Sequence, residues 1–174
     1  YTRGHSIRVS QYAVATAARL GFDGPGLDGI RLGGELHDIG KIGTREAVLH
    51  KAGSLTAEEF QQITEHPALG ERMLAPLARE SPDVLRIVRS HHERLDGAGF
   101  PDGLRGEKIP IEARIVAVAD AFDAMTTRRP YRDPKPADAA VCELRRVAGT
   151  QLDPQAVEAF VEAFPHPGDL PISA

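Results

Sequence analysis

The sequence predicts an all-α protein of six to eight helices. Segments that alternate apolar and polar residues, as strands do, are nearly absent, while apolar residues recur at helical spacing between Gly and Pro signals. The 174 residues include no Trp and only 5% aromatic residues. The core must therefore consist mainly of Leu, Val, Ile and Ala, which suits packed helices in one compact domain.

The first two expected helices end at glycines. Apolar side chains over residues 6–20 fall on one helical face, and Gly21 follows as a helix-ending residue. A Gly- and Pro-rich turn is expected at 23–26. A second helix is expected over residues 28–39, and it stops near Gly40.

The middle of the chain carries three helix-start signals. Thr56, followed three residues later by Glu59, has the capping-box pattern. Pro67 suits the first position of a helix, and Pro76 would kink or stop that helix. The three helices are expected at residues 56–65, from 67 to the proline at 76, and at 81–92.

A long irregular stretch then precedes the last helices. Residues 94–110 are rich in Gly and Asp, and loops of this length inside compact domains are usually functional or mobile. A strongly apolar helix is expected over 111–127, followed by helices at 136–147 and 153–164. Residues 165–174 are expected to form a loose tail.

Composition excludes some classes of protein. The net charge of −4 argues against nonspecific binding to duplex nucleic acid, which usually needs a basic face. No run approaches the roughly 20 apolar residues of a membrane span. Cys142 is the single cysteine, which fits a cytoplasmic location, and we expect it to be a small buried residue. The chain starts at Tyr1 and not at Met, so we expect a piece of a longer protein.

Histidines and aspartates form suggestive groups. Two adjacent pairs lie near helix ends, and single residues lie at other helix positions. Imidazoles and carboxylates are the usual ligands for divalent Fe, Mn, Zn or Co, and adjacent helical residues point about 100° apart, so a pair can serve two ions. Two such ions can activate a bridging water for phosphoryl displacement. The candidates are His5, His37, Asp38, His66, His91, His92 and Asp120.

Ordinary explanations remain open at this point. His5 also suits a solvated or capping residue, and the pair at 91–92 suits the negative end of a helix dipole. Asp120 interrupts an apolar helix, and a buried carboxylate needs a cation or a metal. Arg8, one turn after His5, fits equally well as a surface charge or as the partner of a buried carboxylate.

Longer motifs carry a resemblance to a known family. LHDIGKIG at 36–43 resembles the signature of HD-superfamily phosphohydrolases. HHERLDGAGFP at 91–101, with GLRG after it, resembles the loop that defines the HD-GYP branch, and the segment 113–132 is similar to that branch's next block. The resemblance implies a helical bundle of the HD-domain type, with an HD-GYP phosphodiesterase domain over 1–164.

The resemblance also implies an activity. Members of the HD-GYP family hydrolyse cyclic di-GMP to pGpG, and some continue to GMP, through a hydroxide that bridges metal ions. The seven candidates named above would hold two divalent ions, with Asp38 bridging them. Fe or Mn is expected first, while Zn, Co and Ni stay open. Some members have a Glu that helps to hold a third metal, and Tyr1 stands at that position here.

Four residues match substrate contacts of the family. Lys41 would approach a phosphate and take part in catalysis with Asp38. Arg129 and Arg132 match positions that hold phosphate or guanine, which suits the bidentate fork of a guanidinium. Phe100 replaces the Tyr of the motif, so its ring can stack on a base while a hydroxyl contact is lost.

Two other functions stay open. The domain could be a noncatalytic module that binds cyclic di-GMP or a partner protein such as a diguanylate cyclase. It could also be an HD hydrolase of another nucleotide phosphate ester. Regulatory domains are expected elsewhere in the longer chain.

Overall fold

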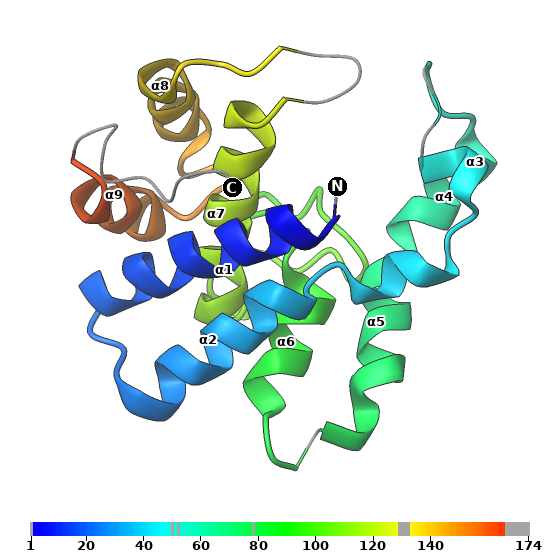
Figure 1. Cartoon of the computed structure of the whole chain (residues 1–174), viewed down its shortest axis with the longest axis horizontal. Coiled ribbons are helices and arrows are strands. Elements are labelled where there is room, and N and C mark those ends of the chain that lie inside the picture. The colour runs from blue at the N-terminus through cyan, green and yellow to red at the C-terminus, as the bar shows by residue number, and fades with distance from the viewer. Residues whose placement is uncertain (1, 50, 52, 78, 129–132, 166–174) are drawn as a thin grey trace.

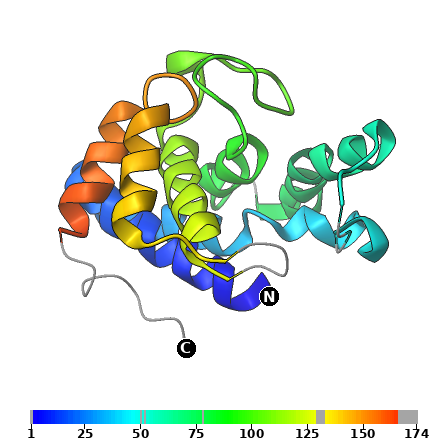
Figure 2. The same ribbon diagram turned by 90° about the horizontal axis from the view of Figure 1, so that it is seen from above.

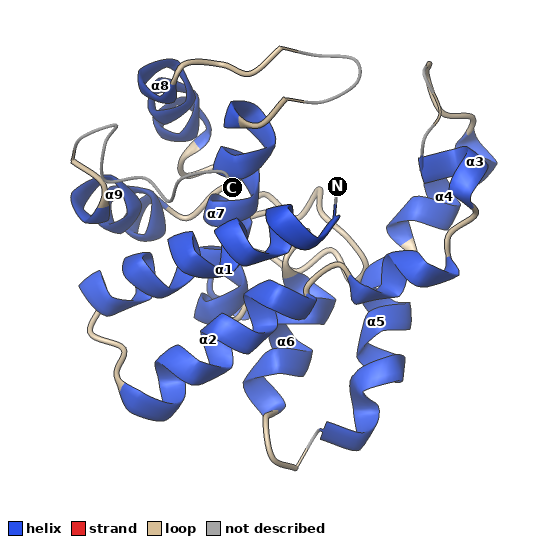
Figure 3. Ribbon diagram, in the orientation of Figure 1, coloured by secondary structure: helices blue, strands red, loops and turns tan. Residues whose placement is uncertain are grey.

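The computed structural model describes residues 2–49, 51, 53–77, 79–128 and 133–165 (Figure 1). The all-α prediction is confirmed, because these residues form helices and loops and no strand (Figure 3). Eight helices have eight or more residues, and α3 is a single turn. The helices are α1 Thr2–Arg19, α2 Gly24–Leu36, α3 Glu46–Leu49, α4 Ala57–Thr64, α5 His66–Leu74, α6 Pro82–Ser90, α7 Ile111–Thr126, α8 Ala137–Val147 and α9 Pro154–Ala163, with short 3-10 helices η1 Ile39–Gly43, η2 Ala75–Leu77 and η3 Gly106–Lys108.

The start of α2 differs from the prediction. The turn expected at 23–26 is wrong, because α2 begins at Gly24 with Pro25 in its first turn. Proline suits that position, since its φ is already helical and its missing N–H would have no partner there. The helix also ends at Leu36 and not at residue 39, so the pair at 37–38 lies in the junction between α2 and η1.

Capping explains why other predicted starts are confirmed. The Thr56 hydroxyl accepts from the Glu59 N–H, and the Glu59 carboxylate accepts from the Thr56 N–H. Asp153 caps α9 by accepting from two backbone N–H groups. The expected burial of Cys142 is wrong, because it lies on α8 away from the buried face that carries Leu144.

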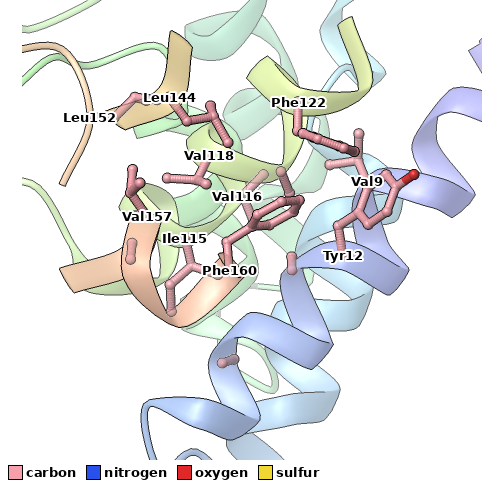
Figure 4. Packing of buried hydrophobic residues seen from close by; sticks show 14 of the residues in the cluster. Val9, Tyr12, Ile115, Val116, Val118, Phe122, Leu144, Leu152, Val157 and Phe160 are labelled. Atoms are coloured by element: carbon pink, nitrogen blue, oxygen red, sulfur yellow. The ribbon is translucent and has the colours of Figure 1, made fainter. Parts of the chain in front are cut away.

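The main core lies where α1, α7 and α9 meet (Figure 4). The ring of Tyr12 packs edge-on against Phe122, with centroids 5.3 Å apart, and Phe122 lies 4.7 Å from Phe160. Most other core residues are Val, Ile, Leu and Ala, as the composition predicts. Each large apolar side chain buried here contributes about 1.5–3 kcal/mol to folding. The core thereby fixes α1 against α7.

The remaining helices flank this core. Figures 1 and 2 place α8 and α9 on one side of the molecule and α3 and α4 on the opposite side. The long loop between α6 and α7 is held by Glu93, whose buried carboxylate accepts from the N–H groups of Asp102 at 2.7 Å and Leu104 at 2.9 Å. Within the described part of the chain, no helix is long and apolar enough to cross a membrane.

The limits of the expected domain stay a prediction. Residues 166–174, nearly all of the expected tail, lie outside the described residues, as does Tyr1.

Candidate metal centre

The structure brings all seven predicted ligands together. They come from α1, the α2–η1 junction, the start of α5, the end of α6, and α7. Their donor atoms form two groups, and within each group the atoms lie within 4.8 Å of one another. The first group is Asp38, His66, His91 and His92, and the second group is His5, His37 and Asp120.

Asp38 belongs to the first group and also faces the second. Its Oδ1 atom is 3.3 Å from His66 Nε2 and 3.8 Å from His91 Nε2. Its Oδ2 atom is 3.5 Å from His37 Nε2 and 3.9 Å from His5 Nε2. The two oxygens therefore face different histidines, which suits a carboxylate that bridges two cations.

Three of the histidines have their tautomer set by the backbone. The Nδ1 atoms of His37, His66 and His91 lie 2.7, 2.6 and 3.0 Å from the carbonyl oxygen three residues earlier. A carbonyl only accepts, so Nδ1 carries the proton and the Nε2 lone pair points into the site. Ligating histidines usually have their second nitrogen oriented in this way.

Two of these donor atoms are left unsatisfied by the described part of the chain. His37 Nε2 and Asp38 Oδ1 are buried and have no hydrogen-bond partner among the residues described. A buried polar atom left unsatisfied costs about 1–3 kcal/mol. A divalent cation would interact favourably with both atoms, so the residues fit a metal site.

His5 is held differently from the other histidines. Its Nδ1 atom lies 2.7 Å from Asp123 Oδ2, and its Nε2 atom lies 3.3 Å from Asp120 Oδ1. Burial lowers the pKa of His5, but the hydrogen bonds to these two carboxylates outweigh it and raise that pKa to about 9. Arg8 pairs with Asp123 at 2.6 Å, so of the two roles left open for Arg8, a surface charge or the partner of a buried carboxylate, the second is found.

Sequence reasoning missed Asp123. The available signal was the one used for Asp120, since both are charged residues on the apolar helix α7, three positions apart. The structure adds that Asp123 is only 1% exposed.

The electrostatics favour the ligand form of three further groups, His91, His92 and Asp38. Burial lowers the pKa of His91 far below its usual value and lowers that of His92 to about 4, so both are neutral at pH 7. Burial raises the pKa of Asp38, but His66, His37 and Lys41 together hold it well below its usual range. Asp38 is therefore ionised.

Two motif glycines allow the close approaches that build the centre. A Cβ atom on Gly40 would lie 1.9 Å from the His66 carbonyl oxygen, so only glycine lets η1 approach the start of α5. A Cβ atom on Gly99 would lie 2.5 Å from the backbone nitrogen of Arg94, where the loop folds back on itself. Gly40 belongs to the motif at 36–43, and Gly99 belongs to the motif at 91–101.

The predicted substrate residues have different surroundings. Lys41 Nζ lies 2.6 Å from Asp38 Oδ2 at the edge of a groove of about 810 Å³. Apolar side chains, among them Ile7 and Ile42, line that groove, and Ile42 is 73% exposed. The ring of Phe100 lies against His92, with centroids 4.8 Å apart, beside a smaller pocket of about 220 Å³. The predicted contacts at positions 129 and 132, both arginines, lie outside the described residues.

Comparison with known proteins gives consistent matches. The profile of the HD domain family matches residues 2–156. The chain is 41% identical over 165 residues to a cyclic di-GMP phosphodiesterase of Thermotoga maritima. The aligned region covers 92% of this chain and 44% of that protein. It is 37% identical over 164 residues to the 3′3′-cGAMP-specific phosphodiesterase 3 of Vibrio cholerae. The aligned region covers 94% of this chain and 35% of that protein.

A solved structure agrees with the fold. An HDG"Y"P protein from Bdellovibrio bacteriovorus superposes with a TM-score of 0.75 at 23% identity, covering 93% of this chain and 52% of that one. The chain spans less than half the length of the two curated relatives.

Proposed function

The chain belongs to the HD domain family, and from that premise we propose that it is a metal-dependent phosphodiesterase that hydrolyses cyclic di-GMP. One observation carries the proposal. Imidazole nitrogens and carboxylate oxygens from five parts of the fold converge around Asp38. The name of the relative in Thermotoga maritima supports the choice of substrate.

We propose that the two groups of donors hold one divalent ion each, Fe or Mn in preference to Zn, Co or Ni. When bound, such ions supply Lewis acidity, which lowers the pKa of water and offsets charge that develops on phosphate oxygens. Asp38 would hold both ions, since its two oxygens face different groups. The hydrogen bonds from Nδ1 of the three histidines keep the Nε2 atoms oriented for this role.

The groove beside Asp38 suits the substrate. Its volume of about 810 Å³ lies within the usual range of about 300–1,000 Å³ for ligand sites. We propose that Lys41, at the edge of the groove, moves from Asp38 to a substrate phosphate, where its positive charge stabilises the negative charge that develops there. Arg129 and Arg132 are proposed to hold phosphate or guanine, and Phe100 to contact a base.

The proposal is tested by turnover. The protein is purified without oxygen, loaded with Mn²⁺ or Fe²⁺, and incubated with cyclic di-GMP, and the products are separated by chromatography. We expect pGpG, with or without further conversion to GMP, and we expect Asp38→Asn to abolish it. The matched control is Glu143→Gln, which alters a carboxylate on α8 that pairs with Arg146. A metal-loaded protein that releases no product would exclude the proposal.

A second substrate is tested in the same assay. The relative in Vibrio cholerae is named for 3′3′-cGAMP, which differs from cyclic di-GMP in one base. Faster turnover of 3′3′-cGAMP than of cyclic di-GMP would assign that substrate instead. Binding of either nucleotide without turnover would favour a noncatalytic module.

The setting of this domain is also a proposal. Because the chain spans less than half of its curated relatives, we propose regulatory domains in a longer cytoplasmic protein, and a diguanylate cyclase as a partner.

A further inference from the structure

Asp123 contacts a candidate ligand from outside the ligand set. We propose that Asp123 is a positioning residue that fixes the tautomer and direction of His5, so that the second group of donors can hold its ion. The inference rests on the proposed metal centre and assigns a role that the seven ligands do not include. Asp123 lies on α7 and His5 on α1, and their side chains meet at 2.7 Å across 118 residues of sequence.

The contrast with the other histidines motivates the proposal. His37, His66 and His91 donate from Nδ1 to a carbonyl of their own local backbone, so the adjoining turn orients each ring. The Nδ1 atom of His5 meets a side chain from another helix instead. The Nδ1 atom of His5 therefore lies against a carboxylate that a single substitution can remove.

Arg8 fixes the carboxylate in turn. Its Nε atom donates to Asp123 Oδ1 at 2.6 Å, and its Nη2 atom donates to Asp123 Oδ2 at 3.0 Å. The same Nη2 atom lies 3.1 Å from the hydroxyl of Thr127. With Arg8 in place, the carboxylate can remain ionised although its side chain is 1% exposed.

This geometry makes asparagine at position 123 informative. Oδ2 of Asp123 accepts from both His5 Nδ1 and Arg8 Nη2, so the amide oxygen of an Asn would take that place and its NH₂ group would face Arg8 Nε. The amide oxygen would still accept from Nδ1 of His5, so the imidazole would keep its proton on Nδ1 and its lone pair on Nε2. Asp123→Asn therefore keeps an acceptor for His5, whereas Asp123→Ala removes it and leaves the tautomer and direction of the ring free.

The test measures metal binding and not activity. Asp123→Asn, Asp123→Ala and the parent protein are stripped with a chelator and titrated with Mn²⁺ against a competing chelator. We expect the parent to bind two ions per chain. We expect Asp123→Ala to bind one ion with parental affinity and the other about 10–100-fold more weakly, the range typical for partners of ligating histidines. Asp123→Asn, which keeps an acceptor for Nδ1 of His5, should lose less affinity than Asp123→Ala.

The matched control separates positioning from simple structural support. Asp153→Asn disrupts another buried Asp–Arg pair, in which Asp153 Oδ2 lies 2.5 Å from Arg114 and neither residue belongs to the two groups of donors. It should lower the unfolding temperature and leave both metal affinities unchanged. If Asp123→Ala lowers the unfolding temperature and leaves both metal affinities unchanged, as expected for Asp153→Asn, Asp123 only supports the fold and the inference is wrong.

Two further outcomes complete the test. Nitrogen-15 spectra of the parent loaded with Zn²⁺ should show the proton of His5 on Nδ1, and a proton on Nε2 would overturn the inference even if the variants fail to fold. A parent protein that binds no metal would contradict the proposed function itself. A parent that binds two ions beside an Asp123→Ala variant with unchanged metal affinities would contradict only the role of Asp123.

Discussion

The Nε2 atoms of His66 and His91 lie 3.3 Å apart, while the Nδ1 atom of each lies within hydrogen-bond distance of a backbone carbonyl. With both protons held at Nδ1, two lone pairs face each other across this gap. Such a contact is unfavourable in the metal-free protein and becomes favourable when a cation lies near both nitrogens. The pair therefore links metal binding to stability.

Removing the metal should destabilise the protein. A ligand that binds only the folded state at 100 times its Kd contributes about 2.7 kcal/mol of stability. We expect a chelator to lower the unfolding temperature by several degrees, and added Mn²⁺ to restore it, as measured by calorimetry. His66→Ala should respond much less to the chelator. An unfolding temperature that is the same with and without the chelator would contradict a metal centre in the purified protein.

Lys41→Met should reduce turnover without loss of metal. Lys41 contacts Asp38 at the edge of the groove, so removing its charge takes away a candidate for phosphate stabilisation. We expect kcat/KM to fall about 100-fold, the scale of one lost electrostatic contact. Lys51→Met is the control, because Lys51 pairs with Glu59 at 2.6 Å and lines neither pocket. Equal activity of the two variants would remove Lys41 from the proposed mechanism.

Gly40→Ala should disrupt the centre through the backbone. The added Cβ atom would lie 1.9 Å from the His66 carbonyl oxygen, so η1 and α5 must separate. Overpacking of this kind costs about 1–3 kcal/mol, and here it also displaces Asp38 from His66. We expect a lower unfolding temperature and weaker metal binding. Gly53→Ala, where a Cβ atom meets nothing within 4 Å, should change neither quantity.

The metal-free protein should lose stability between pH 6.5 and pH 4. Burial lowers the pKa of His92 to about 4 and also lowers that of His91, so the unfolded chain binds more protons than the folded chain in this range. The raised pKa of His5 contributes nothing to this slope, because its stabilisation is complete below pH 6.5 and is lost only as pH rises toward 9.

For His92 alone, moving from pH 7 to pH 5 should cost on the order of 1 to 2 kcal/mol. Thermal unfolding in the presence of a chelator measures the loss. His92→Gln should show a shallower dependence on pH than the parent. Identical profiles for the two proteins would show that His92 is not buried in its neutral form.

Local signals predicted much of the fold, because they act within a few residues. The capping box at Thr56 and the glycine after α1 have local causes, and both are found in the structure. The start of α2 was missed because Gly24 and Pro25 suit a turn and a first helical turn equally well. The choice between them depends on how α2 packs against α1, which no local pattern records.

For the candidate site, too, some features could be predicted from the sequence and others could not. Adjacent pairs and motif spacing identified the seven residues that the fold brings together, whereas their assignment as ligands stays a prediction. The contact between His5 and Asp123 could not be predicted, because it depends on the crossing of α1 and α7 fixed by Tyr12 and Phe122 in the core. The number of residues between His5 and Asp123 in the sequence does not determine the distance between their side chains in the folded protein.

The spread of the seven candidate ligands from His5 to Asp120 has a kinetic consequence. Contacts so distant in sequence close large loops, which is slow and costs entropy before any bond is gained. An ion that needs donors from both α1 and α7 cannot nucleate folding, and a nascent chain cannot complete the centre until α7 has left the ribosome. Bound metal should therefore leave the folding rate almost unchanged and lower the unfolding rate.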